Sequence, residues 1–191
     1  QMEAPRVETA MTRDAVSPNA KVLRTNVAPL RQWQALILAG RYAEAESALR
    51  RHLRRNPRDA EAWSMLADCL RKAGKTRAAV DAYRRLIDTG GPEAINRARY
   101  LAASLLQDQL DDPGAAIPLL RAYLAAGASL RPLEALATLR LARALRSTGE
   151  QQQAMRLLRR VCDEFPDTEA ARQARALLGD VSVTPSRDNR Q

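Results

Sequence analysis

The stretch GRYAEAESALRRHLRRNPRDAEAW, residues 40–63, combines a glycine, an apolar stripe at helical spacing, two arginine doublets and an Asn-Pro pair. Gly40 can take the unusual backbone conformation that ends one helix, and Pro57 cannot continue another. The stretch therefore predicts a helix that is bounded by a turn on each side. It also raises the question whether this is an isolated basic helix or one copy of a recurring unit.

The pattern recurs along the chain. An alanine follows five residues after each of Gly40, Gly74 and Gly149, and a fourth copy fits if Asp111 takes the place of the glycine. The matched alanines are Ala45, Ala79, Ala116 and Ala154, with successive spacings of 34, 37 and 38 residues. The large apolar residues four positions further on are Leu49, Tyr83, Leu120 and Leu158. A period of this length indicates stacked repeat units.

Each copy carries apolar residues at helical spacing on two consecutive segments, so each predicts a pair of helices. We expect helices at residues 28–39, 42–55, 59–73, 76–89, 92–109, 113–126, 130–148, 150–164 and 167–179. Ser129 and Asp112 are expected to cap the helices that follow them. Pro118 predicts a kink in the helix at 113–126, or a late start of that helix.

The matched alanines let the two helices of a pair approach closely, and each pair leaves an apolar face that must stack on its neighbour. The predicted units are residues 26–59, 60–93, 94–128 and 129–166. A capping helix at 167–179 would cover the open end with Ala171, Ala174, Leu177 and Leu178. Residues 25–180 form the repeat domain, preceded by a flexible arm at 1–24 and followed by a flexible tail at 181–191.

The pattern resembles the tetratricopeptide repeat (TPR) over about residues 26–178. The second copy carries the resemblance best, with Trp63, Leu66, Ala67, Leu70, Gly74, Ala79, Tyr83 and Leu86 in register. The resemblance implies an all-α fold, a right-handed superhelix of stacked antiparallel helix pairs. It also implies a concave groove, lined by the first helix of each pair, that binds an extended peptide or a partner helix.

Carried over by register, the groove residues are Gln34, Ile37, Ser64, Asp68, Arg71, Leu101, Leu105, Asp108, Leu139, Arg143 and Arg146. Members of the family that clamp the C-terminal carboxylate of a chaperone use lysines and asparagines at these places. This chain has Gln34 and Asp68 where asparagines would stand, so we reject that subfamily.

The arginine doublets answer the opening question, because they occupy one equivalent place in each copy, just past the large apolar residue. The family resemblance puts them on the convex face. They are Arg50, Arg51, Arg84, Arg85, Arg121, Arg159 and Arg160, here called the arginine ladder. One interpretation is a solvated face that pairs with Glu46, Asp81 and Asp88. The alternative is a stripe that binds nucleic acid or an anionic membrane, although aromatic residues for base stacking are lacking.

The residues give no sign of catalysis. His52 is the single histidine, Cys69 and Cys162 fall in different units, and Asp111-Asp112 precedes a proline as a turn does. Phosphate-binding and nucleophile motifs are missing. We therefore predict no enzyme, no metal and no cofactor, and we place Trp33 and Trp63 in the core.

The net charge is +9 and apolar residues make up 46% of the chain, with no run long enough to cross a membrane. The leading hypothesis is a non-enzymatic scaffold for a protein partner. The second hypothesis is the binding of nucleic acid or an anionic membrane by the arginine ladder, as described above. A third hypothesis is that the chain is an accessory module of a larger bacterial envelope or signalling protein. The last segment, FPDTEAARQARALLG, is similar to the end of bacterial envelope repeat proteins, including the periplasmic coordinator of the Tol–Pal system. Together with the start at Gln1, this favours the periplasm or cell envelope over the cytoplasm.

Overall fold

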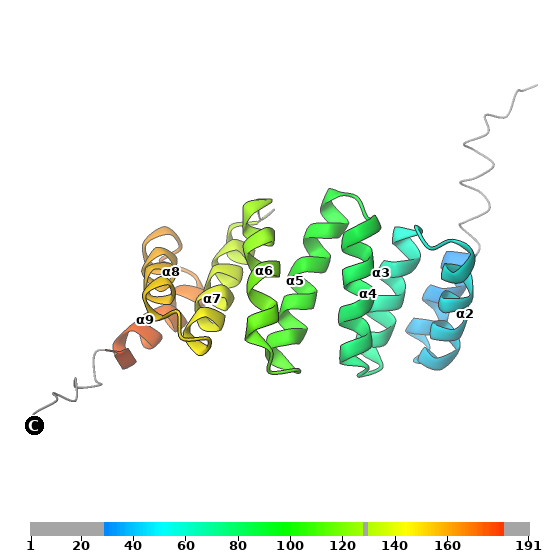
Figure 1. Ribbon diagram of the computed structural model, residues 1–191, viewed down its shortest axis with the longest axis horizontal. Coiled ribbons are helices and arrows are strands. Elements are labelled where there is room, and N and C mark those ends of the chain that lie inside the picture. Colours follow the sequence, from blue (N-terminus) through cyan, green and yellow to red (C-terminus); the bar gives the residue numbers. More distant parts are fainter. Residues whose placement is uncertain (1–28, 128–129, 182–191) are drawn as a thin grey trace, which may run out of the picture.

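The computed structural model describes residues 29–127 and 130–181, with side chains described as far as residue 179. Helices run alternately up and down in a row, each beside the next in sequence (Figure 1). After a helix at residues 29–38 come α2 (Tyr42–Arg55), α3 (Ala60–Lys72), α4 (Thr76–Thr89), α5 (Pro92–Asp108), α6 (Pro113–Ala125), α7 (Arg131–Ser147), α8 (Gln151–Glu164) and α9 (Glu169–Val181). The described residues contain no strand.

This arrangement is an α-solenoid of stacked antiparallel helix pairs, as the sequence predicts. The predicted helix boundaries agree with the observed ones to within two residues. The first helices of the pairs are the helix at 29–38, α3, α5 and α7, and the second helices are α2, α4, α6 and α8. Helix α9 follows as the predicted capping helix. The predicted arm at 1–24, and the tail apart from Val181, lie outside the described residues.

The matched alanines lie where paired helices come together. Ala45, Ala79, Ala116 and Ala154 are all 0% exposed, as a place at a helix contact requires. A methyl group lets two helix backbones approach closely and adds no side-chain entropy cost on burial. Larger residues on either side of each alanine, such as Leu49 and Tyr83, then fill the space between helices.

The turn inside each pair uses a backbone conformation with positive φ. Gly40, Gly74 and Gly149 have φ of 73°, 72° and 90°. Asp111 stands at the equivalent place in the third unit and has φ 49°, the one positive value among non-glycine residues that the structure describes. Aspartate tolerates this region better than most residues but is still strained there. The turn geometry is thus kept even where the glycine is missing.

The structure excludes one of two alternatives for Pro118 and corrects one predicted helix start. Helix α6 begins at Pro113, so Pro118 lies inside it and does not delay its start. Asp112 caps that helix as predicted, its side chain accepting a hydrogen bond from the Ala115 amide at 2.9 Å. The N-cap of α7 is Leu130, one residue after the predicted Ser129, which lies outside the described residues.

The apolar core is divided near its C-terminal end. One cluster runs from Trp33 through α7 to Ala154, while a second holds residues of α7, α8 and α9, among them Leu139, Leu158 and Phe165. Ala171 and Ala174 are buried in the second cluster, and Leu177 and Leu178 pack against it. Helix α9 therefore covers the end of the stack, as expected for a repeat array.

Polar links connect each unit to the next. They join residues 29 to 33 positions apart, about one repeat. Lys75 bonds Glu46 at 2.7 Å, Thr76 bonds Gln109 at 2.6 Å, and Gln107 donates to the main-chain oxygen of Arg140 at 2.9 Å. Such links fix the register between units whose main contacts are apolar.

The turn glycines give a prediction about stability. Replacing Gly74 with alanine should lower the free energy of unfolding by about 1 kcal/mol, because the left-handed conformation disfavours a Cβ. An added Cβ would meet no atom within 4 Å, so backbone strain alone acts. Asp111→Gly should instead raise the stability by about 0.5 kcal/mol. Urea unfolding measures both; equal effects of the two changes would contradict this reading of the turns.

The link between Glu46 and Lys75 gives a second prediction. The hydrogen bond from Lys75, aided by Arg50, holds the pKa of Glu46 below its ordinary value. A carboxyl whose pKa is lowered on folding stabilises the fold above its unfolded pKa, and this contribution disappears as the pH falls through the folded pKa. Glu46→Gln should therefore flatten the loss of stability between about pH 5 and about pH 3.

Thermal unfolding followed across this pH range provides the measurement. The matched control is Glu61→Gln, because Glu61 is exposed and makes no ion pair within the described residues. An acid-stability profile for Glu46→Gln that superimposes on the parent's would refute the role of this link.

Candidate functional site

The first helices share one long face, and side chains of successive units meet on it. Arg97 of α5 reaches back to Asp68 of α3 at 3.0 Å. Arg140 of α7 bonds Asp108 of α5, and Arg143 of α7 donates to Gln173 of α9 at 2.9 Å. We call this shared face the groove face, because the predicted groove would run along it.

The N-terminal part of the groove face is hollowed between the helix at 29–38 and α3. The hollow has a volume of about 290 Å³. Its lining residues are Leu30, Gln34, Ile37, Leu38, Glu61, Met65, Asp68 and Lys72. Leu38 is 75% exposed, the most exposed large apolar side chain in the described part of the chain. The hollow thus has an apolar floor and a rim that carries both signs of charge.

Asp68 organises the middle of the groove face. It accepts a hydrogen bond from the Tyr83 hydroxyl at 2.7 Å and pairs with Arg97 at 3.0 Å and Arg71 at 3.6 Å. Burial raises the pKa of Tyr83 far above its usual value, so the phenol stays protonated and donates. A core residue of a second helix therefore fixes the orientation of a carboxylate on the groove face.

A second hollow, of about 280 Å³, lies between α5 and α7. Arg140 donates two hydrogen bonds to Asp108, at 2.9 and 2.8 Å, and these bonds raise the pKa of the guanidinium. Arg143 also lines this hollow, and Arg146 lies on the same helix; both are exposed. Arg140 is thus neutralised by its partner. Among the described residues, the Arg143 guanidinium bonds only the neutral side chain of Gln173, and no carboxylate there compensates its charge.

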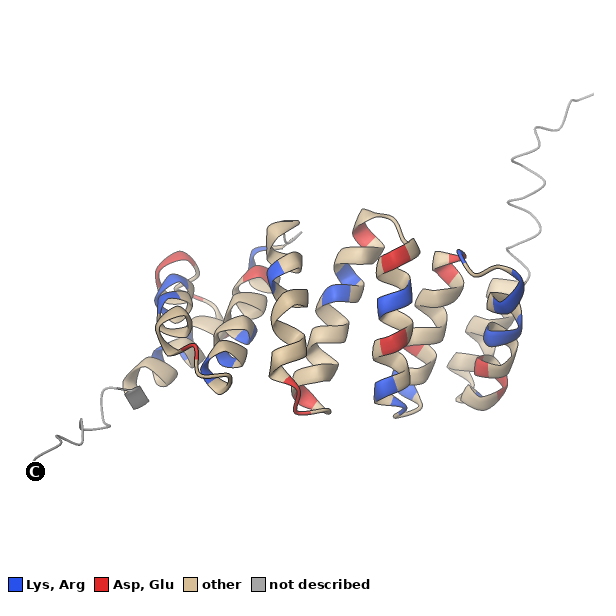
Figure 2. Ribbon diagram, in the orientation of Figure 1, with Lys and Arg blue, Asp and Glu red and all other residues tan. Residues whose placement is uncertain are grey.

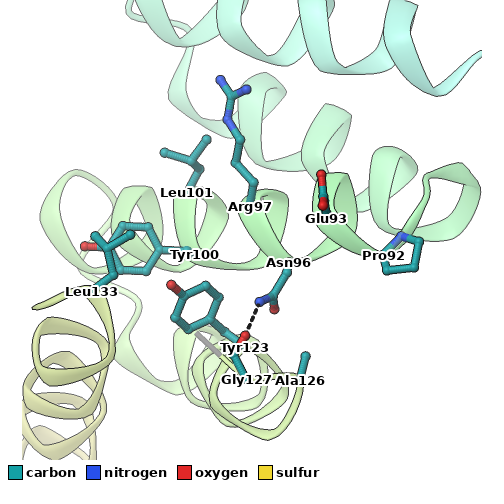
Figure 3. A pocket seen from close by; sticks show the side chains of 10 residues that line it. All are labelled: Pro92, Glu93, Asn96, Arg97, Tyr100, Leu101, Tyr123, Ala126, Gly127 and Leu133. Atoms are coloured by element: carbon teal, nitrogen blue, oxygen red, sulfur yellow. Dashed lines mark hydrogen bonds between the residues drawn. The ribbon is translucent and has the colours of Figure 1, made fainter. Parts of the chain in front are cut away.

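A third hollow, of about 560 Å³, lies among the N-terminal half of α5, the end of α6 and the start of α7 (Figure 3). The rings of Tyr100 and Tyr123 pack in its wall with centroids 5.3 Å apart. Asn96 closes one side by donating to the main-chain oxygen of Gly127 at 3.2 Å. This hollow opens toward the edge of the solenoid where α6 ends, and it includes the exposed Leu133.

The predicted groove residues divide into three groups by exposure. Gln34, Arg71, Asp108, Arg143 and Arg146 are exposed, and Ser64, Asp68 and Leu101 are half-buried. The remaining three, Ile37, Leu105 and Leu139, are buried.

Two of the buried predictions are wrong as contact residues. Leu139 is 0% exposed because the N-terminal half of α7 turns it into the second core cluster, against Leu158 and Phe165. Leu105 is 5% exposed and belongs to the main core. Ile37, although buried, still lines the N-terminal hollow.

Sequence reasoning missed three residues of this face: Leu38, Met65 and Arg140. Each lies one position beyond a residue predicted by the family register: Ile37, Ser64 and Leu139. The available signal for Leu38 was its place in the sequence: it is a large apolar residue that directly precedes Ala39 and the turn glycine Gly40. Arg140 had no comparable signal, because its place depends on how α7 is rotated against α5.

All seven residues of the arginine ladder are exposed on second helices. Four have a carboxylate nearby: Arg50 with Glu46 at 2.9 Å, Arg84 with Asp81 and Arg121 with Glu150 at 3.6 Å, and Arg160 with Glu164 at 2.9 Å. The three others, Arg51, Arg85 and Arg159, make no ion pair within the described residues. Figure 2 shows acidic and basic segments alternating along α4, and a single basic position on α6.

The remaining candidates for chemistry lie in structural settings. His52 bonds Asp59 at 2.7 Å and packs edge-on against Trp33, with ring centroids 4.8 Å apart. Both cysteines are free thiols. Among the described residues, no group of three or more potential ligands is placed to hold a metal ion, and no helix is both long and apolar enough to span a membrane.

Comparisons with known proteins agree with this architecture. Sequence profiles of the tetratricopeptide repeat match residues 30–95 and 135–178. Among solved structures, MamA is 20% identical with a TM-score of 0.62, the alignment covering 78% of this chain and 84% of MamA. YrrB, described as a TPR protein with an unusual peptide-binding site, is 15% identical with a TM-score of 0.59, covering 78% of this chain and 76% of YrrB. No curated protein sequence matches the chain.

A putative kinesin light chain of Podosopora anserina with nearly identical TPR-like repeats also shares the fold. It is 18% identical with a TM-score of 0.55, and the alignment covers 85% of this chain and 98% of that one. The repeat period, the buried alanines, the turn glycines and the two profile matches lead to one assignment. The chain belongs to the tetratricopeptide repeat family and is a repeat scaffold of the kind used for protein interaction.

Proposed function

We propose that the protein is a non-enzymatic scaffold that binds one segment of a partner protein, extended or helical, along the groove face. The observation that carries this proposal is the exposure of Leu38 over the N-terminal hollow. Exposing a large apolar side chain next to an apolar hollow costs free energy in water unless a partner covers it. YrrB, which shares the fold, supports the proposal as a peptide-binding TPR protein.

The N-terminal hollow fits an apolar anchor. Its floor is formed by Leu30, Ile37 and Met65, and its volume suits a single large side chain. Methionine adapts its shape to different ligands, which favours a groove that accepts leucine, isoleucine, methionine or phenylalanine. Glu61 and Lys72 on the rim then contact the polar flanks of the partner segment.

The C-terminal part of the groove face fits an acidic residue. Arg140 is neutralised by Asp108, but the Arg143 guanidinium has only Gln173 as a hydrogen-bond partner within the described residues. Arg146, three residues further along α7, is also exposed. An arginine fork binds a carboxylate through two hydrogen bonds. The bound segment therefore carries its apolar anchor toward the first unit and acidic residues toward the fourth.

The arginine ladder supports a polyanion site less well. Four of its seven arginines have a carboxylate within 4 Å, and α6 contributes a single arginine to the ladder. A stripe that tracks a phosphate backbone would need continuous unpaired charge. We therefore use the ladder as the control surface for the groove.

The prediction is tested with a peptide selected against the intact chain from a random display library. Leu38→Glu and Arg143→Glu should each weaken its binding at least about tenfold, the first by charging the apolar hollow and the second by repelling acidic residues. Fluorescence anisotropy of the labelled peptide gives the dissociation constants. Both changed residues are exposed, and circular dichroism verifies that the helices persist.

Arg85→Glu is the matched control, because Arg85 is an exposed arginine of the ladder that makes no ion pair in the described part of the chain. It should leave peptide binding within about twofold of the parent. Binding that survives both groove changes, or that is lost with Arg85→Glu, would overturn the groove proposal.

A further inference from the structure

The connections from each second helix to the next first helix lie on one edge of the solenoid (Figure 1). Because the units repeat, each presents equivalent positions at this edge, counted from its matched alanine. In the first unit the positions nine, ten and thirteen residues after Ala45 are Arg54, Arg55 and Arg58. All three are exposed, and we call them the basic end.

The same three positions of the fourth unit, counted from Ala154, are Asp163, Glu164 and Asp167. They are also exposed, and we call them the acidic end. Figure 2 shows basic segments at the upper end of α2 and acidic segments at the upper end of α8, at opposite ends of the same edge. The edge therefore carries opposite charges at its two ends.

The fold itself does not require these charges. In the second unit the equivalent positions hold Asp88, Thr89 and Pro92, so the helix pair forms with a quite different set. Asp163 and Glu164 moreover lie in the last turn of α8, where the helix dipole disfavours negative charge. Stability of the repeat thus leaves the acidic end unexplained.

Most of these charges have no partner inside the chain. Arg54, Arg55 and Arg58 form no ion pair within the described residues, and neither do Asp163 and Asp167. Glu164 alone is paired, with Arg160 at 2.9 Å. The two sets have opposite sign and lie at equivalent places of the first and last units. They are complementary to each other and too far apart along the solenoid to meet within one molecule.

We infer that the two ends bind each other in a second copy of the chain, forming an antiparallel dimer along this edge. A half-turn about an axis through the middle of the edge sets the basic end of one copy against the acidic end of the other. The same rotation makes the reciprocal contact at the opposite end, so the assembly closes with two identical contacts. Charge complementarity fixes the antiparallel direction, since a parallel pairing would set like charges together.

The middle of the edge has the composition of an interface centre. Leu133, which is 37% exposed, lines the hollow of Figure 3, and Leu130, which is 61% exposed, is the N-cap of α7. These are two of the three large apolar side chains that the described part of the chain exposes. An apolar centre with charged flanks matches the usual anatomy of protein interfaces. The hollow shares Arg97 and Leu101 with the groove face, while Leu38 and Arg143 are not among its lining residues.

The experiment exchanges the charges at equivalent positions. Variant A carries Arg54→Glu and Arg58→Glu, and variant B carries Asp163→Lys and Asp167→Lys. Variant A alone has two acidic ends and variant B two basic ends, so each should form its own dimer at least about tenfold more weakly than the parent. An equimolar mixture pairs acidic with basic ends at both contacts and should recover the parent's affinity to within about threefold.

Sedimentation velocity over a concentration series at low salt gives the dimer dissociation constants, and added salt should weaken the parent dimer. The control variant carries Arg85→Glu and Arg159→Glu on the ladder and should dimerise like the parent. A parent chain that stays monomeric throughout the series would overturn the inference, leaving the unpaired ends to another partner. A mixture of A and B that associates no better than either variant alone would overturn it as well.

Discussion

The two helices of each unit approach each other through an alanine that has no exposed surface. This close approach sets the distance between helices, and the larger side chains around each alanine pack into the space that remains. A unit built this way keeps one apolar flank that only its neighbour can cover, so the units must stack in a row. The turn with positive φ, the capping by α9 and the polar links between units all follow from that stacking.

The row of units gives the molecule two distinct surfaces. Side chains of successive first helices meet on the groove face, where the Tyr83–Asp68 bond ties a polar group of the face to the core. The edge formed by the connections between units is free of this packing demand, and its residues vary from unit to unit. We therefore assign the proposed functions to residues that the repeat leaves free, such as Leu38, Arg143 and the charged side chains at the two ends.

Most of the fold could be predicted from the sequence, because the constraints that specify it are local. Glycine and proline spacing marks the turns, the matched alanines mark the helix contacts, and helix boundaries follow to within two residues. Asp111 could be placed by register alone, and its φ of 49° shows that the turn imposes its geometry on a residue that disfavours it. The groove residues were harder to predict from the sequence. Leu139 is buried and Arg140 lies half-buried on the groove face because α7 packs against α8 and α9, and no local pattern encodes that rotation.

The close approach of the paired helices is tested most directly by one substitution placed at two sites of α2. Ala45 is fully buried at the helix contact, while Ala43, two residues earlier, is exposed. Ala45→Leu should lower the free energy of unfolding by about 1 to 3 kcal/mol, because the added side chain forces the helices apart. Ala43→Leu should change it by less than about 0.5 kcal/mol. Denaturant unfolding that finds Ala45→Leu as harmless as Ala43→Leu would contradict the account.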